Sequence, residues 1–314
     1  MARIEHLKAF CLIADLHSFS QAAEQCGLSQ PALSQQIKSL EEEYQTQLLH
    51  RKGGRIALTE NGKLLYEYAL KIIALYEHSL EEVRPQNNVL EGELILGASS
   101  GPGEFPVPIL LGMYKQAHPE VSVSLKAGDT NEIIDQVLNH ALEIGFVGNQ
   151  RPDSHLSFQP FFDDQMVLVL HPSHPLTKRK KISIQEFLRI PLILQQKGAG
   201  VRETFFEALK EQGVQQGDVK VLMELGLQDS AKAAVMAGFG GAVISRLGGV
   251  NELASGKLVE VEVEDLDFSR PMYLCTNRTL PLTNLASDFI VFAEANKLKV
   301  IEEYLAPLKT PKGK

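Results

Sequence analysis

The sequence predicts three consecutive parts: a winged helix-turn-helix unit made of helices with a β wing, a long linker helix, and a two-lobed α/β domain. Apolar residues recur at helical spacing through the first 45 residues, a second helical repeat follows Thr59, and strand-like and helix-like segments alternate from Glu93 onward. We therefore expect domains at about 1–59, 60–90 and 91–314. Lobe I should comprise about 91–163 and 269–306, and lobe II about 164–268.

Composition indicates an ordinary globular protein. Of the 314 residues, 44% are apolar and 22% are charged. No apolar run approaches the roughly 18 residues that a membrane helix needs, and no signal peptide is apparent, so we expect a cytoplasmic protein without a membrane partner. Cys11, Cys26 and Cys275 have neither pairing nor metal-ligand spacing, which predicts reduced thiols and no metal or other cofactor.

Charge is distributed unevenly along the chain. The net charge of −8 argues against a protein that binds polyanions over its whole surface. Residues 1–63 contain seven basic and seven acidic side chains, so the rest of the chain carries the whole excess. Any contact with nucleic acid must therefore be local.

The first 26 residues predict two helices. The second covers 21–26, and Ser20 is expected to cap it. The first should bury the face formed by Ile4, Leu7, Phe10, Cys11 and Ala14.

A third helix follows the turn at Gly27. Ser29 can cap it, and Pro31 falls in its first turn, where a missing backbone N–H costs nothing. Its inner face should contain Leu33, Ile37, Leu40 and Tyr44.

The outer face of this third helix carries amides, a hydroxyl and one amine, from Gln30, Ser34, Gln35 and Lys38. Gln can bond adenine N6 and N7, Ser suits several base edges, and Lys reaches guanine or phosphate. The second helix of a helix-turn-helix enters the major groove with its amino end first, where these residues lie. A solvated face that is merely rich in Gln is the alternative.

Residues 48–59 predict a β-hairpin around Gly53-Gly54. Its three cations can reach phosphates or the minor groove, which makes it the wing of the motif. The residues predicted to contact DNA are Ser29, Gln30, Pro31, Ser34, Gln35, Lys38, Arg51, Lys52 and Arg55.

The segment from Ser18 to Gly62 closely resembles the DNA-binding domain of LysR-type transcriptional regulators. Its matching features include Ala22-Ala23, the run SQPALS at 29–34, and Leu58-Thr59. It departs from the family at Gln35, where a basic residue is usual, and at Leu49, where Phe is usual. The resemblance implies sequence-specific binding of double-stranded DNA and no catalytic activity.

The linker helix should be capped by Thr59 and end near Arg84-Pro85. Packing on its own domain would explain its apolar stripe, but the family resemblance implies an antiparallel dimer helix, a dimer of dimers and a pseudo-palindromic operator. RNA polymerase is a further candidate partner. The stripe is formed by Leu65, Ala69, Ile72, Tyr76, Leu80 and Val83.

From Glu93 the alternating pattern predicts parallel sheets covered by helices, in two lobes, with the last strand and helix returning to the first lobe. This region resembles the effector domain of LysR-type regulators, which has the fold of periplasmic solute-binding proteins. Segments of its sequence resemble the family branches that regulate sulfur assimilation and carbon fixation, which favours a sulfur-related anion as the effector. The expected strands are 94–98, 121–127, 144–147, 166–170, 192–194, 219–224, 242–245 and 270–276, and the expected helices are 104–116, 132–139, 184–188, 201–211, 229–237 and 285–298.

Polar residues at the strand ends predict a site for a small anion between the lobes. Ligands of parallel sheets bind beyond the carboxyl ends of the strands, and helix amino ends attract anions. Simple helix capping is the alternative for each residue. Lys197 and Arg202 can add charge, whereas Ala199 and Val201 stand where related sequences often have Ser or Thr. The predicted effector-binding residues are Ser99, Ser100, Thr130, Gln195, Gln196, Gly226 and Gln228.

Two rival functions can be formulated. Residues 97–101 fit the G-x-S-x-G pattern of a hydrolase with Ser99 as nucleophile, for which Asp164 and His171 or His174 are the available partners. That serine follows the first strand of its domain, so no earlier strand can supply an oxyanion hole. The other rival keeps DNA binding but makes the cleft a vestigial protein-interaction module.

Overall fold

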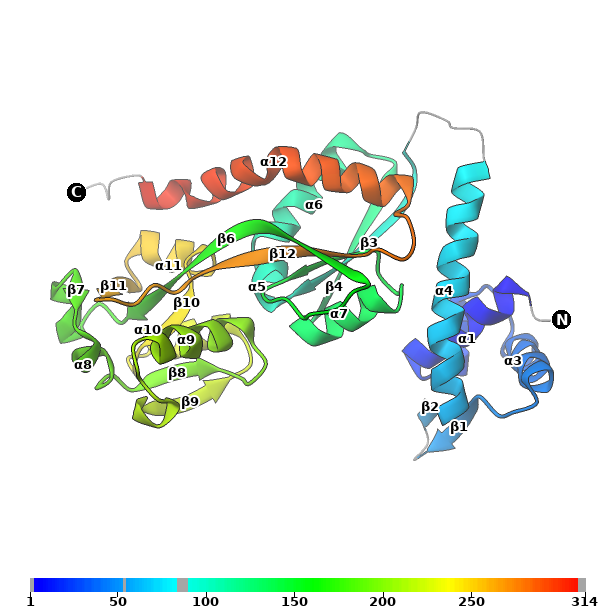
Figure 1. Ribbon diagram of the computed structural model, residues 1–314, viewed down its shortest axis with the longest axis horizontal. Helices are drawn as coiled ribbons and strands as arrows, with labels where there is room; N and C mark the ends of the chain where they lie inside the picture. Colours follow the sequence, from blue (N-terminus) through cyan, green and yellow to red (C-terminus); the bar gives the residue numbers. More distant parts are fainter. Residues whose placement is uncertain (1–2, 53–54, 84–89, 310–314) are drawn as a thin grey trace. The chain divides into compact units, whose positions relative to one another are not determined.

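The computed structural model describes residues 3–52, 55–83 and 90–309. The chain divides into an amino-terminal unit, which contains the described residues up to 83, and a carboxyl-terminal unit, which contains residues 90–138 and 142–309 (Figure 1). Within the described ranges, no helix is long and apolar enough to cross a lipid bilayer.

The amino-terminal unit is a winged helix-turn-helix followed by a long helix, as predicted. Its apolar centre includes Phe10, Ile13, Leu33 and Leu40, all 0% exposed. The hairpin pairs Leu49 with Leu58 in an antiparallel register. The elements are α1 (Ile4–Leu16), α2 (Phe19–Gln25), α3 (Gln30–Tyr44), β1 (Leu49–Lys52), β2 (Arg55–Leu58) and α4 (Glu60–Val83).

Two local predictions in this unit are wrong. Ser18, rather than Ser20, caps α2, because its Oγ accepts a hydrogen bond from the Gln21 N–H at 3.3 Å. The helix therefore begins two residues earlier than expected. Tyr44 is 45% exposed and does not belong to the inner face of α3, because it is the last residue of the helix.

The start of α4 is fixed by Thr59, as expected. The Thr59 Oγ1 accepts from the Gly62 N–H at 2.9 Å and donates to the Gln47 carbonyl at 2.7 Å. Leu65 and Ala69 are buried in the unit's own core, so these two members of the predicted stripe do not face outward. The residues predicted to end the helix, Arg84-Pro85, lie outside the described residues.

The carboxyl-terminal unit has two lobes with separate apolar cores. In lobe I, β3, β4 and β5 are parallel neighbours, and the core includes Leu96, Tyr114, Phe146 and Phe289. The lobe I elements are β3 (Gly92–Ser99), α5 (Ser100–Glu104), α6 (Pro106–Ala117), β4 (Val121–Gly128), α7 (Thr130–Leu138), β5 (Ile144–Val147) and α12 (Asn284–Lys309).

The strands β6 (Leu156–Leu170) and β12 (Ser269–Asn277) run between the lobes (Figure 1). All of β12 pairs antiparallel with the first part of β6, residues 156–165, and β12 also pairs antiparallel with β5 of lobe I. The expectation of purely parallel sheets is therefore wrong, since the connecting strands make the sheet mixed. The predicted return of the last strand and helix to lobe I is confirmed, because Leu274, Phe289 and Val300 lie in its core.

In lobe II, the carboxyl-terminal end of β6 pairs with β10 and β11. Its core includes Leu168, Phe187, Leu192 and Phe205. The elements are a 3₁₀ turn (Pro175–Lys178), β7 (Lys181–Ile182), α8 (Ile184–Phe187), β8 (Leu192–Gln195), α9 (Gly200–Glu211), a second 3₁₀ turn (Gln216–Asp218), β9 (Val221–Leu225), α10 (Gln228–Met236), β10 (Ala242–Ser245), a third 3₁₀ turn (Leu247–Gly249), α11 (Val250–Ser255) and β11 (Val259–Val263).

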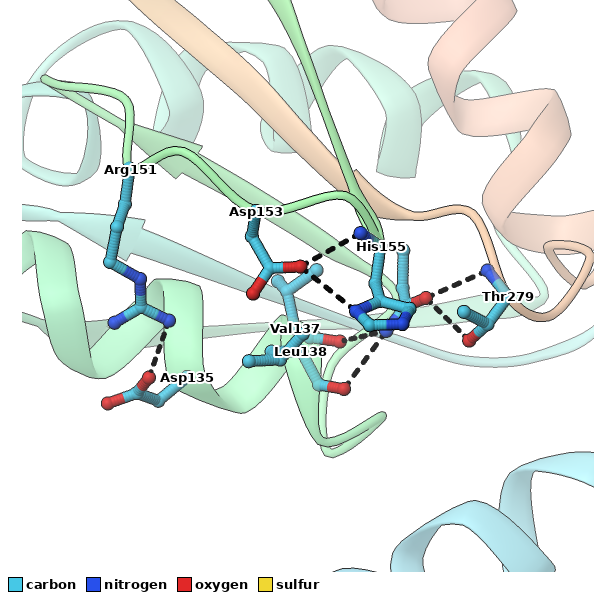
Figure 2. Close-up of polar contacts among 8 residues, drawn as sticks. Asp135, Val137, Leu138, Arg151, Asp153, His155 and Thr279 are labelled. Carbon is cyan, nitrogen blue, oxygen red and sulfur yellow. Dashed lines mark hydrogen bonds and ion pairs between the residues drawn. The ribbon is translucent and has the colours of Figure 1, made fainter.

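A polar network fastens α7 to the end of β12 (Figure 2). The Asn277 Nδ2 donates to the Leu138 carbonyl at 2.9 Å, and the Thr279 Oγ1 donates to the Asn277 Oδ1 at 2.7 Å. Arg151 forms an ion pair with Asp135 of α7 at 2.7 Å. The Asn277 contacts hold α7 against the end of the strand that returns to lobe I, and the Arg151 pair ties α7 to the segment between β5 and β6.

Candidate functional site

The outer face of α3 is an exposed polar strip. Gln30, Pro31, Ser34, Gln35 and Lys38 are all exposed, while Leu33, Ile37 and Leu40 on the opposite face are at most 3% exposed. The side-chain oxygen of Ser29 accepts from the Ala32 N–H at 3.4 Å and so caps the helix. The strip therefore begins at the free amino end of a helix that is anchored from behind.

Two members of the strip have side-chain partners. The Oε1 of Gln30 accepts from the Ser20 Oγ at 3.1 Å, which orients the amide and leaves its N–H groups available. The Lys38 Nζ lies 3.7 Å from a Glu42 carboxylate oxygen, and both side chains are about two-thirds exposed. An exposed pair of this kind is weak, so Lys38 can exchange Glu42 for a phosphate.

The wing lies close to α3. A shallow groove lined by Ser34, Lys38, Leu49 and His50 separates the helix from the hairpin. The backbone of Arg51, Lys52 and Arg55 belongs to the paired strands, but their side chains lie outside the described residues.

In lobe I, the predicted residues lie at the carboxyl edge of the parallel sheet. Ser99 ends β3 opposite Gly128 of β4, and its buried Oγ accepts from the Gly148 N–H at 3.2 Å. Ser100 begins α5 and is exposed. Thr130 begins α7, but Asp129 and not Thr130 caps that helix, since its carboxylate accepts from the Glu132 N–H at 2.9 Å.

In lobe II, the predicted residues lie at the ends of β8 and β9. Gln195 is 7% exposed, and the neighbouring Gln196 side chain approaches Gly226, where a Cβ would lie 3.2 Å from its Oε1. Gln228 is 4% exposed, and its Oε1 accepts from the Ser245 N–H at 2.9 Å. Its Nε2 is buried without a hydrogen-bond partner among the described residues.

The two flanking cations have different surroundings. Arg202 donates to the Gln195 carbonyl at 2.9 Å and pairs with Glu224 at 2.9 Å, so its charge is already matched inside lobe II. Lys197 is exposed. Arg202 therefore supports the end of β8 rather than supplying a spare charge to a ligand.

A buried ion pair joins the two connecting strands, and the sequence did not reveal it. Arg270 of β12 bonds Asp164 of β6 through Nη2 at 3.2 Å, and the Ser245 Oγ donates to the other Asp164 oxygen at 2.6 Å. Around the guanidinium, Gly148 of lobe I and Gly200 of lobe II approach closely. Asp164 and Arg270 are 106 positions apart, so only the pairing of β6 with β12 brings them together.

The hydrolase arrangement is not assembled. Asp164 is bonded to Arg270, the His171 Nδ1 contacts the Ser173 Oγ at 2.7 Å, and the His174 Nδ1 accepts from the Leu176 N–H at 3.3 Å. Ser99 instead contacts the backbone of Gly148. The described part of the chain also holds no cluster of His, Cys, Asp or Glu that is suited to a metal ion.

Comparison with known proteins gives a consistent result for both units. Residues 4–63 match the bacterial regulatory helix-turn-helix protein, lysR family, and residues 87–297 match the LysR substrate binding domain. A probable RuBisCO transcriptional regulator of Cyanophora paradoxa is 32% identical over 280 residues, which cover 87% of this chain and 86% of that relative.

Two solved structures are similar in fold. Full-length CbnR complexed with its target DNA has 20% sequence identity and a TM-score of 0.65, and the match covers 93% of this chain and 99% of CbnR. The regulatory domain of Synechocystis CcmR in complex with 2-PG has 26% identity and a TM-score of 0.61, covering 66% of this chain and 98% of that domain.

Proposed function

The chain belongs to the LysR family of transcriptional regulators, and we propose that it reads a pseudo-palindromic operator with the polar strip of α3. The observation that carries this proposal is the two-sided character of α3. Leu33, Ile37 and Leu40 anchor one face, and the exposed amides, hydroxyl and amine of the other face match the donor and acceptor pattern of the major groove.

The individual residues have different roles in this proposal. Gln30, which Ser20 holds in place, reads a base edge at the amino end of the helix. Ser34 and Gln35 read neighbouring positions, Ser29 and Pro31 position the backbone, and the cations bond phosphates. The cations concerned are Lys38, Arg51, Lys52 and Arg55.

A mobility-shift experiment on the promoter-proximal DNA tests this assignment. Gln30→Ala should reduce discrimination at one base pair by about 1 kcal/mol, because a hydrogen bond from the amide to a base edge is lost. Lys38→Ala should weaken binding to all sequences and lower the salt slope by about 1, as expected for one phosphate contact.

Lys8→Ala is the matched control, because Lys8 is an exposed cation that pairs with Glu77 away from the strip. It should leave both affinity and sequence preference unchanged. If the wild-type protein shifts no fragment of its upstream DNA at low ionic strength, the DNA-reading proposal is wrong.

We further propose that a small anionic effector binds between the lobes and changes the protein's affinity for DNA. Ser99, Ser100 and Thr130 approach it from the carboxyl edge of lobe I, and Gln195, Gln196, Gly226 and Gln228 from lobe II. The 2-PG-bound CcmR domain, at 26% identity, supports a ligand of this class. A ligand can shift a two-state equilibrium only by its differential affinity, so we expect a coupling of about 1–3 kcal/mol.

Calorimetry of the full-length protein with 2-PG and with sulfate tests the effector proposal. Ser99→Ala should weaken binding about tenfold, as expected for loss of a buried hydrogen bond to a charged group. Ser122→Ala is the control, because Ser122 lies at the opposite end of the same sheet. If the wild-type protein binds no oxyanion or carboxylate, the vestigial-cleft alternative is favoured.

The remaining assignments follow from the family. We place the protein in the cytoplasm, where its three thiols stay reduced, and infer that it has no catalytic activity of its own. We expect a dimer of dimers, with RNA polymerase as a further partner at the promoter. Ester hydrolysis that disappears in Ser99→Ala would contradict the non-catalytic assignment.

A further inference from the structure

Arg270 lies at the joint between the two lobes. Its cross-strand neighbour is Asp164, and the two residues are 6% and 0% exposed. One Asp164 oxygen accepts from the Nε of Arg270 at 3.3 Å and from its Nη2 at 3.2 Å, while the other accepts from the Ser245 Oγ. The carboxylate therefore holds one side of the guanidinium in a fixed position.

The third guanidinium nitrogen, Nη1, is buried and has no hydrogen-bond partner among the described residues. A buried charged donor without a partner is costly, so such an atom in a folded protein requires an explanation. A Cβ at Gly148 would lie 3.0 Å from Nη1, and one at Gly200 would lie 2.5 Å from it. Because Gly148 belongs to lobe I and Gly200 to lobe II, Nη1 faces the seam between the lobes.

The amino end of α9 lies beside the Nη1 of Arg270. Gly200 is the first residue of this 12-residue helix, and Ala199 before it provides no side-chain cap. The free N–H groups there carry a partial positive charge of about half an elementary charge. A guanidinium and a helix amino end repel each other, and an anion placed between them can accept hydrogen bonds from both.

Lobe I contributes a further donor beside this place. The Ser99 Oγ accepts from the Gly148 N–H, so its hydroxyl proton can still be donated to an oxyanion. Gly101, whose added Cβ would lie 3.2 Å from the Nη2 of Arg270, brings the start of α5 to the same guanidinium. Donors from both lobes thus surround one buried cation.

We propose that Arg270 binds the effector, with Nη1 donating to one oxygen of an oxyanionic group that the amino end of α9 contacts from lobe II. The inference rests on the proposed effector function and adds to it the residue that meets the ligand's charge. It limits the ligand to molecules that bring a carboxylate, phosphate or sulfate group to the joint of the strands. Asp164 is a positioning residue, since it fixes Nε and Nη2 so that Nη1 points into the seam.

Two variants separate this role from a purely structural ion pair. Arg270→Lys keeps a positive charge opposite Asp164, but a compact ammonium cannot hold that carboxylate and also present a planar donor across the seam. Gly200→Ala leaves both charged residues intact and places a methyl group against Nη1, while alanine suits a helix better than glycine. Gly112→Ala in α6 is the control, because its added Cβ meets open space.

Titration calorimetry of the full-length protein with sulfate, phosphate and glycolate provides the measurement, and thermal melts check that each variant is folded. Arg270→Lys and Gly200→Ala should each weaken the anion that the wild-type protein binds best by about tenfold or more. Gly112→Ala should bind it as the wild-type protein does. DNA binding without anion should persist in all three variants.

The outcomes distinguish this inference from the function on which it rests. If Ser99→Ala loses the anion while Arg270→Lys and Gly200→Ala keep wild-type affinity, the effector site stands and the role of Arg270 is overturned. If the wild-type protein binds none of the three anions, both proposals are overturned. Should Arg270→Lys fail to fold, wild-type affinity in Gly200→Ala is sufficient to reject the inference.

Discussion

At the scale of single residues, burial decides the chemistry of the cysteines. Burial raises the pKa of Cys11 to about 12, and the nearby Asp15 carboxylate adds to the effect. Burial also raises the pKa of Cys275 to about 12, although Arg151 opposes it. Cys26 is only half-buried. Cys26 is therefore more accessible than the other two thiols. Cys11 and Cys275 are buried, and their high pKa means that they rarely ionise.

This difference predicts selective alkylation of the native protein. The thiolate is the reactive form, and at pH 8 a thiol of pKa 12 is ionised to about one part in 10⁴. Raising the pH should speed the reaction of Cys11 and Cys275, because their thiolate population rises all the way to pH 12. With iodoacetamide at pH 8, peptide mass spectrometry should find Cys26 modified first, and all three thiols modified in urea. Rapid native labelling of Cys275 would contradict the assigned burial.

Residues whose roles depend on local sequence were predictable, and residues whose roles depend on the fold were not. The sequence predicts Ser29 as a cap because the cap, the turn and the helix are adjacent in the chain, and the structure confirms it. The prediction of Ser20 as a cap is wrong because Ser18 is an equally good capping residue two positions away. Arg270 and Asp164 could not be paired from sequence, since nothing local indicates which strands become neighbours.

At the scale of elements, the long strand β6 shows where sequence patterns become ambiguous. Only its last five residues, Met166 to Leu170, form an unbroken apolar run, and these were the predicted strand. The earlier part alternates less regularly because it pairs with β12 at the joint of the lobes, where polar side chains such as Asp164 are needed. The predicted helix 104–116 corresponds to α6, which begins at Pro106, and the short helix α5 before it was not expected.

The contact between α4 and the hairpin yields a prediction about an element. Gly62 lies in the first turn of α4, where an added Cβ would come 2.0 Å from the Leu48 carbonyl oxygen. That oxygen also accepts from the Thr59 N–H at 3.0 Å, so it cannot move freely. Gly62→Ala should destabilise the amino-terminal unit by about 2–3 kcal/mol through overpacking.

Hydrogen exchange of peptides from α1 and α3 measures this effect within the full-length protein. Exchange should accelerate in Gly62→Ala at moderate urea concentrations. Gly112→Ala provides the comparison, because in open space alanine favours a helix by about 0.5–1 kcal/mol over glycine. Equal protection of α1 and α3 in Gly62→Ala and the wild-type protein would show that α4 can shift away from the hairpin at little cost.

At the scale of the whole molecule, the outer side of α4 indicates how chains associate. Large apolar side chains that are 40–57% exposed follow one another along this helix, at Leu64, Tyr68, Ile72, Leu75 and Tyr76. The predicted stripe is therefore only partly exposed. Leu65 and Ala69 pack in the core of their own unit, and the exposed apolar side chains lie on the neighbouring face of α4. A continuous exposed apolar face of this kind marks an interface, which fits the oligomers of the family.

Breaking that face should therefore affect DNA binding without touching α3. The double variant Tyr68→Glu with Leu75→Glu places two charges in the proposed helix–helix interface, where they would lose hydration without gaining partners. Sedimentation velocity should show a species smaller than the wild-type assembly. Binding to a two-half-site operator should weaken by about 10²-fold or more, because the second half-site is no longer held at high effective concentration. Affinity for a single half-site should change little.

Glu67→Lys, on the polar side of α4, should preserve both assembly and affinity. If the double variant still sediments as the wild-type oligomer, the association of chains must use another surface, and the spacing of the two recognition helices would have to be set elsewhere in the molecule.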